Sequence, residues 1–340
     1  MLIYTGGTIG MIEDPVTGAL KPFNFEQILD EVPEIRKFGY QIDSVSFNPL
    51  IDSSNVEPSV WVKLCDTIAD NYDKYDGFVV LHGTDTMSYS ASALSFMLED
   101  LEKPVIFTGS QLPIGMLRTD GKENLISSIE IAGAKTADGH AMVPEVCIFF
   151  DSFLLRGNRT TKFSAENFSA FKSFNLPELA EAGIHIRYNR SVIRYPEVWG
   201  KPLKLHKHLD TSVSVLKMFP GITDEMIDIF LSNIKSKAVI IETFGAGNAP
   251  TREEFLHIIK KTIDSGKIIV NVTQCLAGSV DMSTYEAGIY LEQQGVISGH
   301  DSTFEAAITK LFFLMGQSSD NKYVRLNMGN NLRGEISLEL

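Results

Sequence analysis

A glycine-rich loop near the start of the chain carries two threonines whose hydroxyls could act as nucleophiles. The segment Leu2–Gly10 reads LIYTGGTIG, an apolar run that leads into paired glycines, with Thr5 before them and Thr8 after them. Glycines allow a tight turn and a close approach of the backbone to a ligand. The pattern is typical of a nucleophile loop, in which a hydroxyl attacks and backbone N–H groups face the developing oxyanion.

Two other interpretations apply to the same residues. A dinucleotide-binding loop has the pattern GxGxxG directly before a helix, whereas Gly6, Gly7 and Gly10 have a different spacing and residues 11–22 read as loop. An ordinary strand-to-loop turn would also contain these residues. A decision therefore needs a second segment.

The segment Gly77–Met87 (GFVVLHGTDTM) reads as a buried strand followed by polar residues. In open α/β sheets, ligands bind at the carboxyl ends of the strands, so we expect Thr84 and Asp85 to face a site. We interpret His82 as a structural histidine, because the sequence indicates no partner that would make it a base.

A lysine follows another apolar run, in the segment Phe150–Lys162 (FDSFLLRGNRTTK). A threonine hydroxyl is a poor nucleophile at neutral pH and needs a neighbouring base. A lysine that is desolvated or lies beside another cation can serve as that base. Taken alone, Lys162 would be an ordinary surface charge, and only its place after a strand makes it a candidate.

Small polar groups also follow apolar runs in Asn48–Ser54 (NPLIDSS) and Thr108–Pro113 (TGSQLP). Five such strand ends can meet at one edge of a sheet. Their combination favours a binding or catalytic site more strongly than each motif does alone.

Strands and helices must alternate to position these loops. Continuous apolar runs predict strands that are covered on both faces, as in a parallel sheet, over 77–81, 104–107, 146–150, 239–241 and 268–272. Helical spacing predicts helices over 59–72, after Pro58, and over 91–101. Capping-box patterns at Thr251 with Glu254 and at Ser302 with Glu305 predict two helix starts, and Gly266 predicts a helix end.

Two domains are expected, since single cores stop growing at roughly 250 to 300 residues and the chain has 340. We place a larger N-terminal α/β domain over residues 1–185, a linker over 186–210 and a smaller C-terminal α/β domain over 211–340. The linker is basic and contains proline, and we interpret its charges as a solvated crossover.

Composition excludes several classes of protein. The 44% of hydrophobic residues suffices for packed cores, and the formal charge of −13 would repel phosphates, so we expect neither nucleic acid nor a membrane as partner. Cys65, Cys147 and Cys275 lack the spacing of a zinc site, and we expect three buried reduced thiols and no metal. Without a signal peptide or an apolar run of about 20 residues, an intracellular location is expected.

Two of the motifs, TGGTIG and HGTDTM, resemble the two signatures of bacterial-type L-asparaginases. Further similar segments are DSS, TGSQLP, RGNRTTK, NLPELAEAGIHIR, GAGNAP, TQC and NLRGE, which span nearly the whole chain. They resemble the type I, cytoplasmic branch more than the secreted type II branch. The resemblance implies two α/β domains, a homodimer or homotetramer, a cytoplasmic location and no cofactor.

The resemblance also implies roles for individual residues. Thr8 resembles the nucleophile, and Thr84, Asp85 and Lys162 resemble the group that supports it. The residues that would bind the substrate are Asp52, Ser53, Thr84, Asp85 and Ser110. On physical grounds we expect the backbone N–H groups near Gly7 and Gly83 to form the oxyanion hole. Asn248 and Tyr285 are candidates for completing a neighbouring subunit's site.

The sequence departs from the family pattern at two positions. Many members have a tyrosine about ten residues after the nucleophile, whereas Ala19 stands near that position here, and Tyr285 is our candidate replacement. Some type I members bind asparagine as an effector through an arginine, and this chain has Glu242 there. A carboxylate cannot bind the effector's carboxylate, so we expect no such allosteric response.

The leading hypothesis is an asparaginase with weak glutamine activity, which hydrolyses L-asparagine through an acyl-enzyme. A catalytically silent asparagine-binding sensor is the alternative from another class, since the expected loop tyrosine is missing. The asparaginase-like subunit of an archaeal tRNA-dependent amidotransferase carries the same motifs, together with an additional N-terminal domain.

Overall fold

The computed structural model describes residues 1–13, 20–22 and 32–337, which form two compact units, Met1–Lys207 and His208–Leu340. Each unit is described by itself. The boundary lies inside the stretch 186–210 that we interpreted as a linker. However, Ile186–Tyr188 forms a strand in the sheet of the first unit, so the beginning of that stretch belongs to the first unit.

The first unit is built on an eight-stranded sheet with the order β13-β12-β9-β8-β7-β5-β1-β4. Its strands are β1 (Leu2–Tyr4), β4 (Ser44–Ser46), β5 (Phe78–Leu81), β7 (Val105–Thr108), β8 (Val146–Phe150), β9 (Phe153–Arg156), β12 (Ala180–Ala182) and β13 (Ile186–Tyr188). The five strands from β4 to β8 pair in parallel, and β9, β12 and β13 are antiparallel. This confirms the expected mostly parallel α/β sheet.

The register of the parallel strands brings the predicted site loops to one edge. Tyr4 pairs with Leu81, and Leu81 pairs with Thr108, so β1, β5 and β7 end side by side. The segments that follow these strands are TGGTIG, HGTDT and GSQLP. Since β5 and β7 are buried along their whole length, these loops stand on a rigid base.

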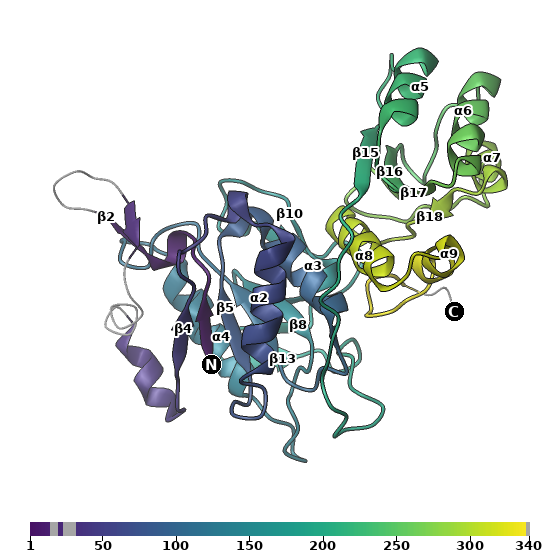
Figure 1. Ribbon diagram of the computed structural model, residues 1–340. Helices are drawn as coiled ribbons and strands as arrows, with labels where there is room; N and C mark the ends of the chain where they lie inside the picture. The colour runs from purple at the N-terminus through teal and green to yellow at the C-terminus, as the bar shows by residue number, and fades with distance from the viewer. Residues whose placement is uncertain (14–19, 23–31, 338–340) are drawn as a thin grey trace. The chain divides into compact units, whose positions relative to one another are not determined.

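Three longer helices accompany this sheet: α2 (Pro58–Ala69), α3 (Met87–Met97) and α4 (Gly121–Gly133) (Figure 1). The helix after Pro58 is confirmed, and Pro58 is its first residue. The helix predicted over 91–101 was misplaced, because α3 begins at Met87 and ends at Met97. Residues Leu98–Glu99 form β6, which pairs with β14 (Lys204–Leu205).

Four short segments complete the pairing in the first unit. The stretch 11–22, which we read as loop, contains two strands that pair antiparallel, β2 (Met11–Glu13) and β3 (Leu20–Pro22). The loop interpretation was wrong for these residues, because their backbones pair across the intervening segment. β10 (Thr161–Lys162) pairs with β11 (Phe171–Lys172) and thereby fixes the backbone that carries Lys162.

The second unit is a four-stranded parallel sheet with helices. Its strands are β15 (Val213–Lys217), β16 (Ala238–Thr243), β17 (Ile268–Thr273) and β18 (Ile297–Ser298), in that order. Its helices are α5 (Asp224–Asn233), α6 (Glu253–Asp264), α7 (Glu286–Gln294), α8 (Phe304–Gln317) and α9 (Asn321–Met328). This confirms the predicted smaller C-terminal α/β part.

Both predicted capping boxes were wrong by one residue. The cap of α6 is Arg252, which makes no side-chain capping bond, and the cap of α8 is Thr303, whose Oγ1 accepts from the Ala306 N–H at 3.1 Å. At α8 the two short polar residues Ser302 and Thr303 adjoin each other, so the sequence does not decide which one has the extended backbone of a cap. Gly266 does end α6, with a φ of 95°.

The cysteine prediction was partly wrong. Cys65 and Cys147 are buried, but Cys275 is exposed, and all three are free thiols. The described part of the chain contains no cluster of metal-binding side chains. None of its described helices is both long and apolar enough to cross a membrane.

Candidate active site

Three loops meet at close range at the carboxyl edge of the large sheet. A Cβ added to Gly7, which has a φ of 94°, would lie 2.5 Å from the backbone N and Cα of Gly83. A Cβ added to Gly83 would lie 2.5 Å from Ser53 Oγ. Glycine is therefore required where the loops after β1 and β5 contact each other, and these contacts bring Ser53 beside both.

Thr8 begins the 3₁₀ turn Thr8–Gly10 that follows Gly7. A side chain of β1 stabilises this turn, because Tyr4 Oη donates to the carbonyl of Gly10 at 3.0 Å. Thr8 is half-buried, whereas its neighbours Gly7 and Ile9 are buried. Among the residues that the structure describes, none hydrogen-bonds the Thr8 hydroxyl.

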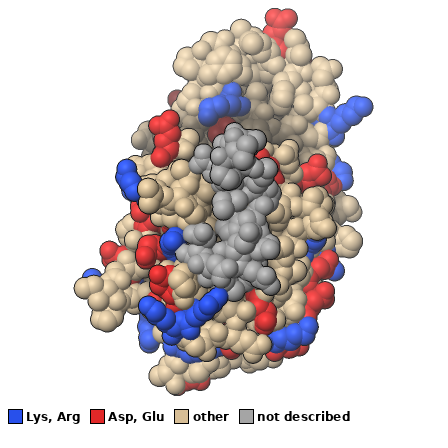
Figure 2. All heavy atoms as spheres, turned by 90° about the vertical axis from the view of Figure 1, so that its left-hand side faces the viewer, with Lys and Arg blue, Asp and Glu red and all other residues tan. Residues whose placement is uncertain are grey.

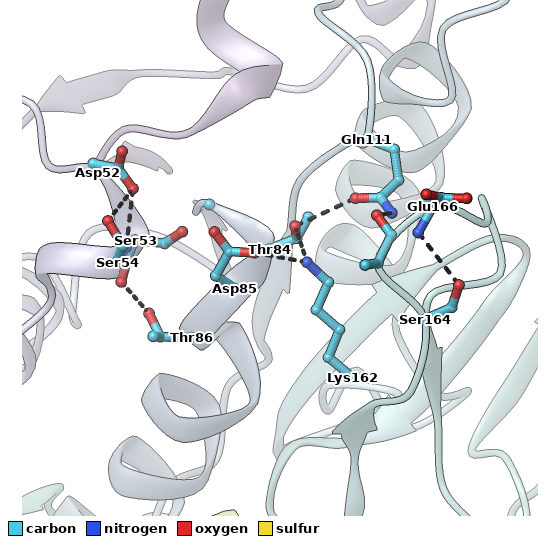
Figure 3. A network of polar contacts seen from close by, with 12 residues as sticks. Asp52, Ser53, Ser54, Thr84, Asp85, Thr86, Gln111, Lys162, Ser164 and Glu166 are labelled. Carbon is cyan, nitrogen blue, oxygen red and sulfur yellow. Dashed lines mark hydrogen bonds and ion pairs between the residues drawn. The ribbon is translucent and has the colours of Figure 1, made fainter.

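Lys162 meets Thr84 and Asp85 in one polar network (Figure 3). Its Nζ donates to Thr84 Oγ1 and to Asp85 Oδ1, each at 2.8 Å. The Lys162 side chain is 16% exposed and that of Asp85 is 63% exposed. The sequence separates Lys162 from the other two by more than 70 positions, so this meeting is a property of the fold.

Asp52 and Ser53 lie at the start of a further 3₁₀ turn, Ser53–Asn55. Asp52 Oδ1 accepts from both the N–H and the hydroxyl of Ser54, each at 2.9 Å, and these bonds lower the pKa of the Asp52 carboxyl. Ser53 is buried, and its carbonyl accepts from Thr86 Oγ1 at 2.7 Å. The turn of Ser53 is thus joined to the turn of Thr84 and Asp85.

Ser110 and Gln111 follow β7 at the same edge. The Ser110 hydroxyl is buried and donates to the carbonyl of Leu112 at 2.5 Å, so it holds its own loop. Gln111, which our sequence reasoning did not select, contacts the network directly, because its Oε1 accepts from Thr84 Oγ1 at 3.3 Å. Its place beside Ser110 in TGSQLP was the signal that could have identified it.

His82 is structural, as we interpreted it. It is buried, its Nδ1 lies 2.7 Å from the Gly83 carbonyl, and its Nε2 lies 2.9 Å from Ser90 Oγ. Burial lowers its pKa to about 4. A neutral imidazole that is fully occupied by these two contacts supports the Gly83 loop.

The candidate residues of the second unit lie in segments that follow its strands. Asn248 is half-buried in a turn after β16, where its N–H donates to the Phe244 carbonyl at 2.8 Å. Tyr285 precedes α7 and is 53% exposed. Glu242 lies 3.7 Å from Lys217 Nζ in an ion pair. Ala19, near the expected loop tyrosine, lies outside the described residues.

Two family models match most of the chain. The Asparaginase, N-terminal model matches residues 1–194, and the Glutaminase/Asparaginase C-terminal domain model matches residues 212–328. The chain belongs to the asparaginase family. It is therefore an amidohydrolase of the asparaginase type, as the sequence motifs predicted.

Individual relatives are similar to this chain over almost its whole length, and two of the following three are L-asparaginases. L-asparaginase 1 of Escherichia coli strain K12 is 43% identical, over 98% of this chain and 96% of that protein. The 60 kDa lysophospholipase of Mus musculus is 40% identical over 99% of this chain, which covers 62% of that longer protein. The solved L-asparaginase I from Vibrio cholerae has a TM-score of 0.89 and 43% identity, covering 99% of this chain and 98% of that one.

Proposed function

We propose that this asparaginase hydrolyses L-asparagine with the Thr8 hydroxyl as nucleophile, through a β-aspartyl ester. The observation that supports this most is the pair of 2.8 Å bonds from Lys162 Nζ to Thr84 Oγ1 and Asp85 Oδ1. They place a lysine and a second threonine at the edge where the Gly7 loop contacts Gly83. A hydroxyl nucleophile requires a neighbouring proton acceptor, and we assign that role to Lys162 in its neutral amine form.

The reaction proceeds in two steps. As Thr8 Oγ1 bonds to the amide carbon, its proton passes to the neutral amine of Lys162, which Thr84 and Asp85 hold in place, and from there to the leaving nitrogen, and ammonia departs. Backbone N–H groups near Gly7 and Gly83 stabilise the tetrahedral oxyanion. The loss of one such donor typically costs about a hundredfold to a thousandfold in rate. Water then attacks the ester, releases L-aspartate and restores the threonine.

The substrate's charged groups fit the polar side chains around this network. Asp85 and Asp52 provide carboxylates for its ammonium group, and both are exposed at the site. Thr84 lies between Asp85 and Gln111. Ser53 and Ser110 would donate hydrogen bonds from a hydroxyl or an N–H group to the carboxylate of the substrate. Because the Ser110 hydroxyl already donates to Leu112, its N–H is the donor that we assign to substrate.

Self-association, a cytoplasmic location and weak glutamine hydrolysis belong to the same proposal. A homodimer or homotetramer would let Asn248 and Tyr285 of one copy complete the site of another.

The carboxylate of Glu242 forms an ion pair with Lys217 and cannot bind the carboxylate of an effector asparagine. We therefore expect the rate to rise hyperbolically with asparagine concentration, and a sigmoidal rate curve would contradict this part.

The proposal is tested by ammonia release from asparagine and glutamine by wild type, Thr8→Ala and Lys162→Met. Both variants should lose at least about a hundredfold in kcat, because Thr8→Ala removes the attacking hydroxyl and Lys162→Met removes the group that takes its proton. Thr251→Ala, a threonine exposed on the second unit, is the control and should keep wild-type activity. Asparagine binding by wild type without ammonia release would instead favour the silent sensor.

A further inference from the structure

Gln111 makes three hydrogen bonds that join the catalytic network to a neighbouring loop. Its Oε1 accepts from Thr84 Oγ1 at 3.3 Å (Figure 3). Its Nε2 donates to the carbonyls of Ala165 at 3.2 Å and Asn167 at 3.1 Å. The loop that carries these two carbonyls directly follows Lys162 along the chain. Gln111 therefore contacts Thr84 directly, and it also binds the loop that follows Lys162, the other partner of the 2.8 Å contact.

The orientation of the Gln111 amide follows from these partners. Backbone carbonyls only accept hydrogen bonds, so the two carbonyls require the NH₂ group, and the amide oxygen must face Thr84. Thr84 then donates its hydroxyl proton to Gln111 and turns its lone pairs toward Lys162 Nζ. The Thr84 hydroxyl thus has one acceptor, Gln111 Oε1, and one donor, Lys162 Nζ.

The backbone of Gln111 is held as firmly as its side chain. The carboxylate of Asp120 accepts from the Gln111 N–H at 2.9 Å through Oδ2 and from the Leu112 N–H at 3.2 Å through Oδ1. Asn124 Nδ2 donates to the Gly109 carbonyl at 3.0 Å. The amide of Gln111 is thus projected toward Thr84 from a rigid loop at the start of α4.

We propose that Gln111 is a positioning residue that fixes the Thr84 hydroxyl against Lys162. This inference rests on the proposed catalytic role of Thr84. Without Gln111, the hydroxyl keeps Lys162 as its partner but can rotate, and the loop that follows Lys162 loses two hydrogen bonds. Because a displacement of about 1 Å at a reacting group can cost about a hundredfold in rate, the effect appears in kcat.

The experiment compares kcat and KM for asparagine in Gln111→Met, Gln111→Asn, Ser164→Ala and Thr84→Val. Gln111→Met removes all three hydrogen bonds, and Gln111→Asn retains an amide that is one methylene too short to bridge. Ser164→Ala is the matched control for loop order. Its hydroxyl accepts from the N–H groups of Glu166 at 3.4 Å and Asn167 at 3.0 Å, in the same loop, without touching Thr84.

We expect both Gln111 variants to lose at least about tenfold in kcat with KM within about twofold of wild type, and Ser164→Ala to keep wild-type kcat. If Gln111→Asn unfolds at the same temperature as wild type, a folding defect is excluded as the cause of the lower kcat. An equal loss in Ser164→Ala, or a loss confined to KM, would overturn the proposal. If Thr84→Val retains activity, the proposed function itself fails. An inactive Thr84→Val beside normal Gln111 variants would refute the positioning role alone.

Discussion

At the scale of single residues, the ion pair between Lys162 and Asp85 is placed for chemistry more than for stability. The Asp85 side chain is 63% exposed, and exposed ion pairs contribute at most about 1 kcal/mol to folding. Its value lies in geometry, since one ammonium contacts a carboxylate and a hydroxyl at 2.8 Å each. A lysine that is mostly buried and held on two sides has few positions available to it.

The buried His82 produces a pH dependence of stability that can be measured. Burial lowers its pKa from 6.5 to about 4, so between these values the unfolded chain binds one proton more than the folded chain. This contribution to the free energy of unfolding is complete above pH 6.5 and falls by on the order of 3 kcal/mol as the pH drops to 4. His82→Gln should remove this pH dependence.

The measurement for His82 is urea unfolding of wild type, His82→Gln and His185→Gln between pH 7 and pH 4. His185 is exposed, and its replacement should leave the wild-type slope unchanged. If His82→Gln kept the same loss of stability on acidification as wild type, the buried neutral imidazole would not be its source.

The residue types of the site could be predicted from sequence, but their contacts could not. Thr84 and Asp85 follow a recognisable strand, and this pattern predicted a polar site at the end of that strand. Lys162 and Gln111 come from other segments, and their distances to Thr84 depend on β10 and on the Asp120 carboxylate. No spacing in the sequence encodes these three-dimensional contacts.

At the scale of elements, glycine at position 7 is required by the contact of two loops. Gly7→Ala would introduce a side chain at a φ of 94° and place its Cβ 2.5 Å from the Gly83 backbone. We expect unfolding to become easier by at least about 2 kcal/mol, from backbone strain and displacement of the loops together. We also expect kcat to fall, because Thr8 follows directly.

Gly39→Ala separates the two contributions to this effect. Gly39 has a φ of 68°, but a Cβ there would have no atom within 4 Å, so the substitution adds strain without a clash. It should cost about 1 kcal/mol and leave kcat unchanged. Equal effects of the two substitutions on kcat would show that the contact between Gly7 and Gly83 is not required for activity.

Element existence was easier to predict than element boundaries. The strands β5, β7, β8, β16 and β17 consist mostly of apolar residues, and each was predicted within about two residues. The predicted end of α3 was wrong because Leu98 continues the apolar spacing of the helix but pairs with Leu205 in a strand. Pairing with a segment more than 100 positions away leaves no mark in a local pattern.

At the scale of the whole molecule, the chain has two compact units, one with a mostly parallel sheet and one with a parallel sheet. The acidic surface is interspersed with basic residues on the face shown in Figure 2. Mixed subunits identify the copy of the chain that supplies Asn248 to a site.

Mixed oligomers of Thr8→Ala and Asn248→Ala chains should recover activity that neither variant has alone. If Asn248 acts on a neighbouring copy, one site of a mixed pair combines an intact Thr8 with an intact Asn248. Random pairing makes about half of the dimers mixed, and each mixed dimer has one intact site of its two. Refolding the two variants together should then restore about a quarter of wild-type activity. The assay is ammonia release after co-refolding.

The matched control for subunit mixing is the pair Thr8→Ala and Lys162→Met. Both residues belong to the first unit of one chain, so no mixed pair contains an intact site, and activity should stay at the level of the single variants. Failure of Thr8→Ala and Asn248→Ala to complement, with each chain shown to associate, would place Asn248 outside the neighbouring site.

The central claim, that Thr8 is the nucleophile, is tested most directly by trapping the acyl-enzyme. Enzyme mixed with excess asparagine is quenched in acid within its first turnovers, digested and mapped by mass spectrometry. We predict an aspartyl ester on the peptide that contains Thr8, and its absence from Thr8→Ala. An ester on Thr84 instead, or full turnover by Thr8→Ala, would contradict the account.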